Sequence, residues 1–173
     1  MITSAESIWL SPNVEDRILG IAARLTDSGQ TLAIVECTLG GAIGHLMTNV
    51  PGASAWFLGG IAPYSARFKE SALGLAAEAF AGHGAVSAEA AQLLATAMRD
   101  RTGADWALAE TGLAGPRGKH RSSKPTGTIY ICLIDPNGQR FDFVHETGLD
   151  ERLENKSAFV QQVIGILDRS ISK

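Results

Sequence analysis

The feature that most constrains the fold is the alternation of short apolar runs with longer amphipathic segments along most of the chain. Residues 31–35 and 106–110 are short apolar runs, which are typical of buried strands. A further strand is expected within 55–64. Residues 128–134 and 140–146 flank Asp-Pro-Asn-Gly, a hairpin signal. The sequence therefore predicts a three-layer α/β/α domain with a mixed sheet, in which the hairpin supplies the antiparallel part.

The amphipathic segments between these runs predict the helices. Ser11-Pro12 is typical of a helix start, and the apolar spacing behind it continues to a stop at 27–29. Ser87 is expected to cap a helix whose apolar positions run to Met98. Further helices are expected at 42–48, 65–75 and 150–171, and a loop at 111–125.

Length and composition limit the class of protein. A chain of 173 residues, 45% hydrophobic and 19% charged, predicts one globular domain over 1–173. Its net charge of -3, without a block of like charges, argues against nucleic acid or a membrane surface as partner. No apolar run approaches the length of a membrane span, and no signal peptide is recognised. We expect a cytoplasmic protein, and its glycine- and alanine-rich faces permit a homo-oligomer.

No cysteine or histidine spacing of the metal-binding kind occurs, so neither a metal nor a cofactor is expected, and both Cys37 and Cys132 are expected to be free.

Three segments place glycines or reactive groups just past strand ends: 36–41, 59–69 and 111–128. Ligands bind at such ends in α/β sheets. Each segment alone is also explained as a turn. The last is the most basic stretch, and we interpret it either as a solvated loop or as a cover that attracts phosphate or carboxylate (Arg117, Lys119, His120, Arg121 and Lys124).

Six motifs in order resemble one family. The chain reads Glu-Cys-Thr-Leu-Gly-Gly at 36–41, Gly-Ala-Ser-Ala-Trp-Phe-Leu-Gly-Gly-Ile-Ala-Pro-Tyr at 52–64, and Lys69. It continues with Gly-Ala-Val-Ser at 84–87, Thr-Gly-Leu-Ala-Gly-Pro at 111–116 and Lys-Pro-Thr-Gly-Thr-Ile at 124–129. These motifs resemble the C-terminal domain of CinA, the competence/damage-inducible protein. Members of that family include nicotinamide mononucleotide amidases (PncC). The resemblance is close over about residues 31 to 135.

The resemblance implies metal-independent hydrolysis of a small-molecule nucleotide, nicotinamide mononucleotide, to nicotinic acid mononucleotide and ammonia. By the ungapped alignment, Cys37 replaces the family's nucleophilic serine, and Lys69 and Tyr64 are the other catalytic residues. A second alignment deletes the serine, pairs Cys37-Thr38 with the family's Cys-Thr and inserts Leu39. Substrate-binding roles carry over to Glu36, Thr38, Gly40, Gly41, Ser54, Thr111, Gly112, Gly115 and Lys124.

A thiol in this place suggests a specific chemistry. An unperturbed cysteine ionises near pKa ~8.5, so a charged Lys69 would favour the Cys37 thiolate and then donate a proton. Backbone N–H groups near Gly40 and Gly41 would bind an oxyanion or a phosphate. Alternatively, Cys37 is only a small buried apolar residue. Three hypotheses stay open: this amidase, an inactive homologue that binds a nucleotide or a protein partner, and an amidase with another carboxamide substrate. Whether the domain works with a separate CinA N-terminal-type partner is also open.

Overall fold

Five strands form one sheet in the computed structural model, which describes residues 12–116 and 124–171. Their order across the sheet is β2-β1-β3-β4-β5. β1 is parallel to β2 and β3, whereas β4 is antiparallel to both β3 and β5. The mixed sheet and its antiparallel hairpin are therefore confirmed. The strands are β1 (Leu32–Glu36), β2 (Phe57–Ile61), β3 (Trp106–Leu113), β4 (Thr128–Ile134) and β5 (Arg140–Glu146).

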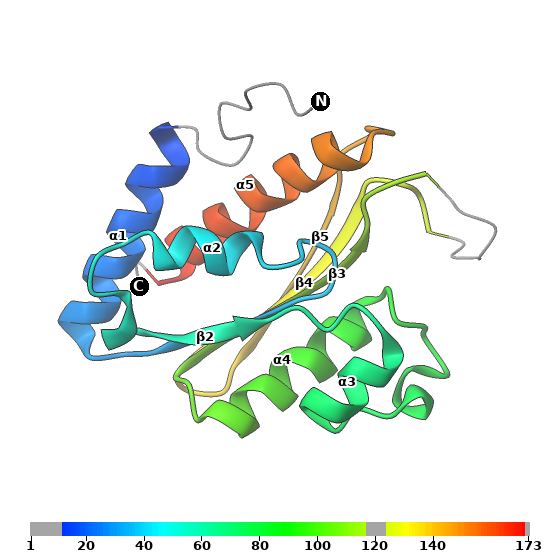
Figure 1. The fold of residues 1–173 in the computed structure, drawn as a ribbon, viewed down its shortest axis with the longest axis horizontal. Helices are drawn as coiled ribbons and strands as arrows, with labels where there is room; N and C mark the ends of the chain where they lie inside the picture. Colours follow the sequence, from blue (N-terminus) through cyan, green and yellow to red (C-terminus); the bar gives the residue numbers. More distant parts are fainter. Residues whose placement is uncertain (1–11, 117–123, 172–173) are drawn as a thin grey trace.

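Helices cover both faces of this sheet (Figure 1). One face carries α1 (Pro12–Ser28), α2 (Ala42–Thr48) and α5 (Arg152–Ser170), and the other carries α3 (Ala66–Leu73) and α4 (Ala88–Thr102). Short 3-10 turns lie before β2 (Ala53–Ala55, η1) and after α3 (Ala77–Phe80, η2). The predicted cap of α4 is present, because the Ser87 hydroxyl accepts the N–H of Ala90 at 3.0 Å. The three-layer α/β/α architecture is confirmed.

The side chains of β1 alternate between two apolar cores. Leu32 and Ile34 pack with α1, α2 and α5, whereas Ala33 and Val35 pack with α3 and α4. All five residues of β1 are buried, as expected for a strand with neighbours on both sides. Each large apolar side chain buried in this way contributes about 1.5–3 kcal/mol. The buried central strand β1 therefore fixes the position of Cys37, the residue that follows it.

The bounds of one strand, β3, differ from the prediction. β3 continues three residues past the expected end at 110, because Thr111, Gly112 and Leu113 pair with β4. The loop expected at 111–125 therefore begins at Ala114. Glycine is required at 112, since a Cβ there would lie 2.5 Å from the Thr128 carbonyl oxygen. β2 lies within the expected 55–64, after η1 and before the chain leaves the sheet at Ile61.

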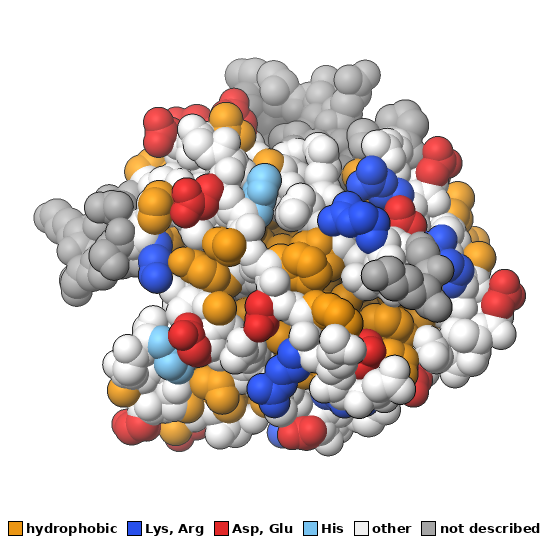
Figure 2. Space-filling model, turned by 180° about the vertical axis from the view of Figure 1, so that it is seen from behind, with side chains coloured by type: hydrophobic (Ala, Val, Ile, Leu, Met, Phe, Trp, Pro, Cys, Tyr) orange, Lys and Arg blue, Asp and Glu red, His pale blue; other side chains and the backbone are white. Residues whose placement is uncertain are grey.

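β5 forms one edge of the sheet. Apolar side chains gather in the middle of the face seen from behind, where this edge lies (Figure 2). Val144 is 60% exposed there, and Phe141 and Phe143 are half-buried. Self-association of the chain stays a prediction.

None of the helices that the structure describes is long and apolar enough to cross a membrane.

Candidate functional site

Three strand ends bring the candidate site together. Val35 on β1 lies opposite Ile61 on β2, and Glu36 lies opposite Glu110 on β3. Because these strands are parallel, the chain leaves all three at the same edge of the sheet. Cys37, which follows β1, therefore lies beside the segment that leads from β2 into α3. Two of the three predicted segments, 36–41 and 59–69, thus meet at this edge.

Cys37 and Lys69 form the centre of the site. The Cys37 side chain is 7% exposed and packs on the face of the sheet covered by α3 and α4. Lys69 lies in α3, which is fixed at its start by the Ser65 hydroxyl, and its side chain is 6% exposed. Its ammonium group donates to the Pro63 carbonyl at 2.9 Å, and its positive charge acts on the Cys37 thiol. A buried lysine needs such partners, because an unpaired buried charge is costly.

The thiol of Cys37 is neutral at neutral pH. Burial raises its pKa to about 12, and the negative charge of Glu110 acts in the same direction. The positive charge and hydrogen bond of Lys69 lower the pKa, but burial outweighs them. Lys69 does favour the thiolate, as expected, but its effect is smaller than that of burial. Sulfur can act as a nucleophile here only if another group accepts its proton.

Glu36 holds the start of α2. Its carboxylate accepts the N–H groups of Gly41 at 3.1 Å, Ile43 at 3.0 Å and Gly44 at 2.9 Å. These are the donors that a helix start leaves without intrahelical partners. The side chain is 1% exposed. The N–H group of Gly41 is therefore already occupied by a buried carboxylate of the chain. Binding of an oxyanion or phosphate by the other N–H groups near Gly40 and Gly41 stays a prediction.

Glu110 is a site residue that was not predicted from the sequence. It is fully buried, and its Oε1 accepts the N–H groups of Thr38 at 2.7 Å and Leu39 at 2.8 Å. Its backbone carbonyl accepts the N–H of Cys37 at 3.2 Å. Burial, with a smaller contribution from the charge of Glu36, raises the carboxyl pKa to about 7, although the hydrogen bonds from Leu39 and Thr38 oppose this shift. The available signal was that two apolar runs, at 31–35 and 106–109, are each followed by a glutamate.

Four further predicted binding residues lie around the end of β3. The Thr38 hydroxyl donates to the Gly112 carbonyl at 3.3 Å, which ties the loop after β1 to this strand. Thr111 is 3% exposed and donates to the Ala85 carbonyl at 2.7 Å. Gly115 lies against Arg152 of α5, whose guanidinium would be 2.7 Å from an added Cβ. Their substrate contacts stay predictions.

Other predicted residues lie farther from the thiol. Tyr64 is 75% exposed on the segment between β2 and α3. Ser54 is exposed in η1, which precedes β2 and so lies at the opposite end of the sheet from Cys37. The ammonium of Lys124 lies 5.4 Å from the centre of the Tyr130 ring. The rest of the expected cationic cover, 117–123, lies outside the described residues.

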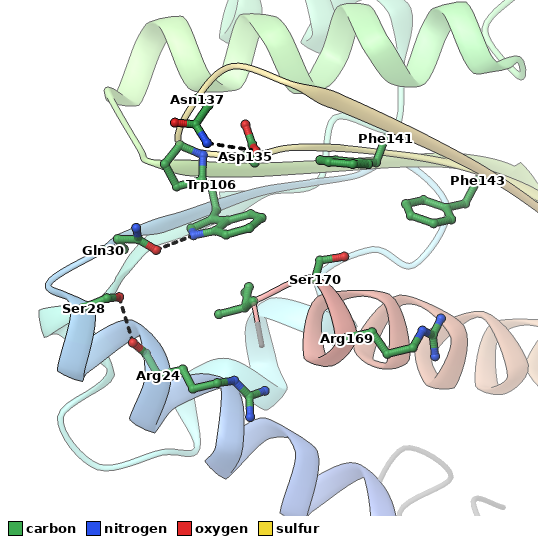
Figure 3. A pocket seen from close by; sticks show the side chains of 12 residues that line it. Arg24, Ser28, Gln30, Trp106, Asp135, Asn137, Phe141, Phe143, Arg169 and Ser170 are labelled. Atoms are coloured by element: carbon green, nitrogen blue, oxygen red, sulfur yellow. Dashed lines mark hydrogen bonds between the residues drawn. The ribbon is translucent and has the colours of Figure 1, made fainter. Parts of the chain in front are cut away.

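A large pocket lies at the other end of the sheet, where β1 and β3 begin (Figure 3). Its volume is about 1050 Å³, and the Trp106 indole N–H donates to Gln30 inside it at 2.8 Å. Its lining includes Phe141 and Phe143 but neither Cys37 nor Lys69. Within residues 12–116 and 124–171, no group of three or more His, Cys, Asp or Glu side chains is arranged to hold a metal ion.

The sequence matches the family model of the CinA C-terminal domain over residues 15–171. A CinA-like protein of Synechococcus sp. is 44% identical over 118 residues, 68% of this chain and 28% of the relative. A CinA-like protein of Citrifermentans bemidjiense is 40% identical over 146 residues, 84% of this chain and 34% of the relative. The chain therefore spans about a third of the length of the curated relatives it matches.

Solved structures of similar size share the fold. The competence/damage inducible protein CihA of Agrobacterium tumefaciens has a TM-score of 0.84 at 28% identity, covering 93% of this chain and 96% of that one. A CinA superfamily protein of Klebsiella pneumoniae has a TM-score of 0.84 at 24% identity, covering 92% and 98%. At 24% identity, the similarity to the Klebsiella pneumoniae protein shows a shared fold only.

Proposed function

The chain belongs to the CinA C-terminal domain family, and on that premise we propose that it is a metal-independent amidohydrolase with Cys37 as its nucleophile. The proposed reaction converts nicotinamide mononucleotide to nicotinic acid mononucleotide and ammonia. One observation carries the proposal: a thiol and a lysine are both buried at the carboxyl end of the central strands, where the charge of the lysine acts on the thiol. Of the three catalytic residues carried over from the family, Cys37 and Lys69 are buried, whereas Tyr64 is exposed.

The geometry supports acyl transfer through a thioester. The Cys37 sulfur attacks the carboxamide carbon, the C–N bond breaks, and water then hydrolyses the thioester. The departing nitrogen needs a proton, and Lys69 carries one next to the sulfur. Tyr64 would have to turn inward to take part, because its ring is 75% exposed. The basic residues 117–124 are the proposed binders of the substrate phosphate.

Ammonia release from nicotinamide mononucleotide by the purified protein tests this proposal. The matched set is the wild type, Cys37→Ala, Cys37→Ser and Lys69→Ala. We expect release by the wild type and a loss of at least about a hundredfold in Cys37→Ala and Lys69→Ala. Unchanged release in Cys37→Ala would exclude the thiol mechanism.

A second candidate function is a homologue without activity that binds a nucleotide or a protein partner. The observation in its favour is that the thiol is neutral and Tyr64 points to solvent. It predicts calorimetric binding of nicotinamide mononucleotide with no ammonia from any variant. A gain of activity in Cys37→Ser would show an intact scaffold with an unsuitable nucleophile. Release from another carboxamide only would identify an amidase with a different substrate.

A further inference from the structure

The large cavity at the end of the sheet opposite Cys37 has no part in the proposed reaction. Its volume of about 1050 Å³ is close to the upper limit of about 1,000 Å³ that is usual for small-molecule sites. It lies between the β4–β5 hairpin and the carboxyl ends of α1 and α5 (Figure 3). The cavity is therefore large enough to hold a ligand of its own.

Aromatic rings form the sheet side of this cavity. Trp106 of β3 and two phenylalanines of β5, Phe141 and Phe143, contribute them (Figure 3). The Trp106 indole N–H donates to Gln30 at 2.8 Å, which fixes the indole in the wall. Both phenylalanines are only half-buried, so their rings are open to a ligand. Such rings favour a planar aromatic partner, because they stack on it and bury its apolar surface.

Arginines gather on the helix side of the cavity. Arg24 of α1 and Arg169 of α5 line it. Arg17 approaches the same place, because its guanidinium and that of Arg169 lie 3.0 and 3.2 Å from a Cβ built on Gly165. The carboxylate between these helices, Asp168, lies 2.6 Å from Arg24 and 3.9 Å from Arg17. Three guanidinium groups around one carboxylate leave an excess of positive charge, which favours an anion.

Two of these arginines have hydrogen-bonding capacity to spare. Among the residues that the structure describes, the Arg169 side chain forms no hydrogen bond or ion pair. Arg24 is paired with Asp168, but its buried Nε–H has no partner in the same part of the chain. Buried N–H groups nearly always have a partner. The Arg169 guanidinium is thus the clearest contact for an anionic group, with Arg24 beside it.

The negative groups around the cavity do not oppose an anion at the arginines. Asp135, the carboxylate in the lining, belongs to the hairpin side and accepts the Gln139 N–H at 2.7 Å within its own turn. At the end of α1, the Leu25 carbonyl already accepts the Gln30 N–H at 3.0 Å. A ligand therefore fits with its anionic group toward the helices and its ring toward the sheet.

We propose that this cavity binds an aromatic anion, that is, a carboxylate or phosphate ester carried on a planar ring. The ring lies against Trp106 and Phe143, and the anionic group lies against Arg169. The proposal does not depend on the amidase reaction, because neither Cys37 nor Lys69 lines the cavity.

The test is a fluorescence titration with two probes. Anilinonaphthalene sulfonate is an aromatic anion whose emission rises in apolar surroundings, and phenylnaphthylamine is its uncharged relative. Arg169→Gln removes the cation at an exposed position, and Arg169→Lys keeps the charge. Ser170→Phe fills the cavity from α5 at a half-buried position. Arg101→Gln is the matched control, because Arg101 is an exposed arginine of α4 outside the lining.

We expect Arg169→Gln to bind the sulfonate about tenfold more weakly, with binding of phenylnaphthylamine within about twofold of the wild type. Arg169→Lys should recover most of the affinity for the sulfonate. Ser170→Phe should weaken both probes at least about tenfold, because it occupies their space. Arg101→Gln should match the wild type. Stronger displacement of the sulfonate by naphthyl phosphate than by naphthoate would identify a phosphate ester, and the reverse a carboxylate.

Equal affinity of the wild type and Arg169→Gln for the sulfonate would overturn the recognition of charge. Undiminished binding of both probes by Ser170→Phe would place them elsewhere and overturn the site. Two copies of the chain that cover this face would exclude the probes and sediment as a dimer that Ser170→Phe dissociates, and this result would also overturn the proposal. Absence of ammonia release would reject the amidase reaction and leave the outcome of the titration unchanged.

Discussion

Two buried carboxylates determine the shape of the loop after the central strand. Glu110 binds the N–H groups of Thr38 and Leu39, and Glu36 binds those of Gly41, Ile43 and Gly44. Five backbone donors in seven residues are thus satisfied by two side chains in register on adjacent strands. The local sequence predicted Cys37 and Lys69 but not this arrangement, because it depends on β1 and β3, which are about seventy residues apart in the chain.

At the residue scale, Glu36→Gln should destabilise the protein by roughly 2–4 kcal/mol, because an amide N–H₂ would replace one of the two acceptor oxygens facing three N–H donors. Urea unfolding measures this change. Glu78→Gln, at an exposed carboxylate, should stay within about 0.5 kcal/mol of the wild type. Equal stability of the two variants would contradict the assigned role of Glu36.

At the element scale, patterns that are local in sequence were predicted well. The bounds of α2, β4 and β5 agree with the sequence, because caps, turns and apolar spacing determine them. β3 was predicted too short, since Thr111 and Gly112 resemble a turn, and only their pairing with β4 keeps them in the sheet. The same extension moves two predicted binding residues from a loop onto a strand.

The close approach of β3 and β4 makes a direct prediction for Gly112→Ala. Its Cβ would meet the Thr128 carbonyl at 2.5 Å, and the backbone of a paired strand cannot move away cheaply. We expect a loss of about 1–3 kcal/mol in urea unfolding. Gly82→Ala is the matched control, because nothing lies within 4 Å of its added Cβ. A loss in the control as large as that in Gly112→Ala would argue against steric contact as the cause.

Asn155 connects α5 to the site end of the sheet. It is fully buried, and its amide donates to the carbonyls of Ala114 at 2.9 Å and Leu149 at 3.0 Å. Asn155→Ala leaves these two carbonyls without this donor and the Thr147 hydroxyl without its acceptor, so we expect about 2–3 kcal/mol lower stability. Hydrogen exchange should quicken around residues 113–115 and 147–149. Unchanged exchange there would contradict this anchoring role.

At the scale of the whole molecule, the buried site is coupled to folding through protons. The carboxyl pKa of Glu110 is about 7 in the folded chain, against an ordinary value of 4.5. The folded state therefore holds a proton that the unfolded state has released, and the stability from Glu110 is lost as pH rises from about 4.5 to about 7.

The unfolding free energy of the wild type minus that of Glu110→Gln should therefore be larger at about pH 5 than at about pH 8. Taking the difference cancels the titration of the other groups. Urea unfolding at both pH values gives it, and a difference that does not depend on pH would show that the carboxyl of Glu110 is not held neutral by burial.

The most direct test of a cysteine amidase is to trap its covalent intermediate. Wild-type protein mixed with nicotinamide mononucleotide and quenched in acid should carry the acyl group as a thioester on the peptide that contains Cys37, as read by mass spectrometry. The adduct should be absent in Cys37→Ala, and hydroxylamine should remove it. Ammonia release without any adduct on Cys37, and with full activity in Cys37→Ala, would contradict the assignment.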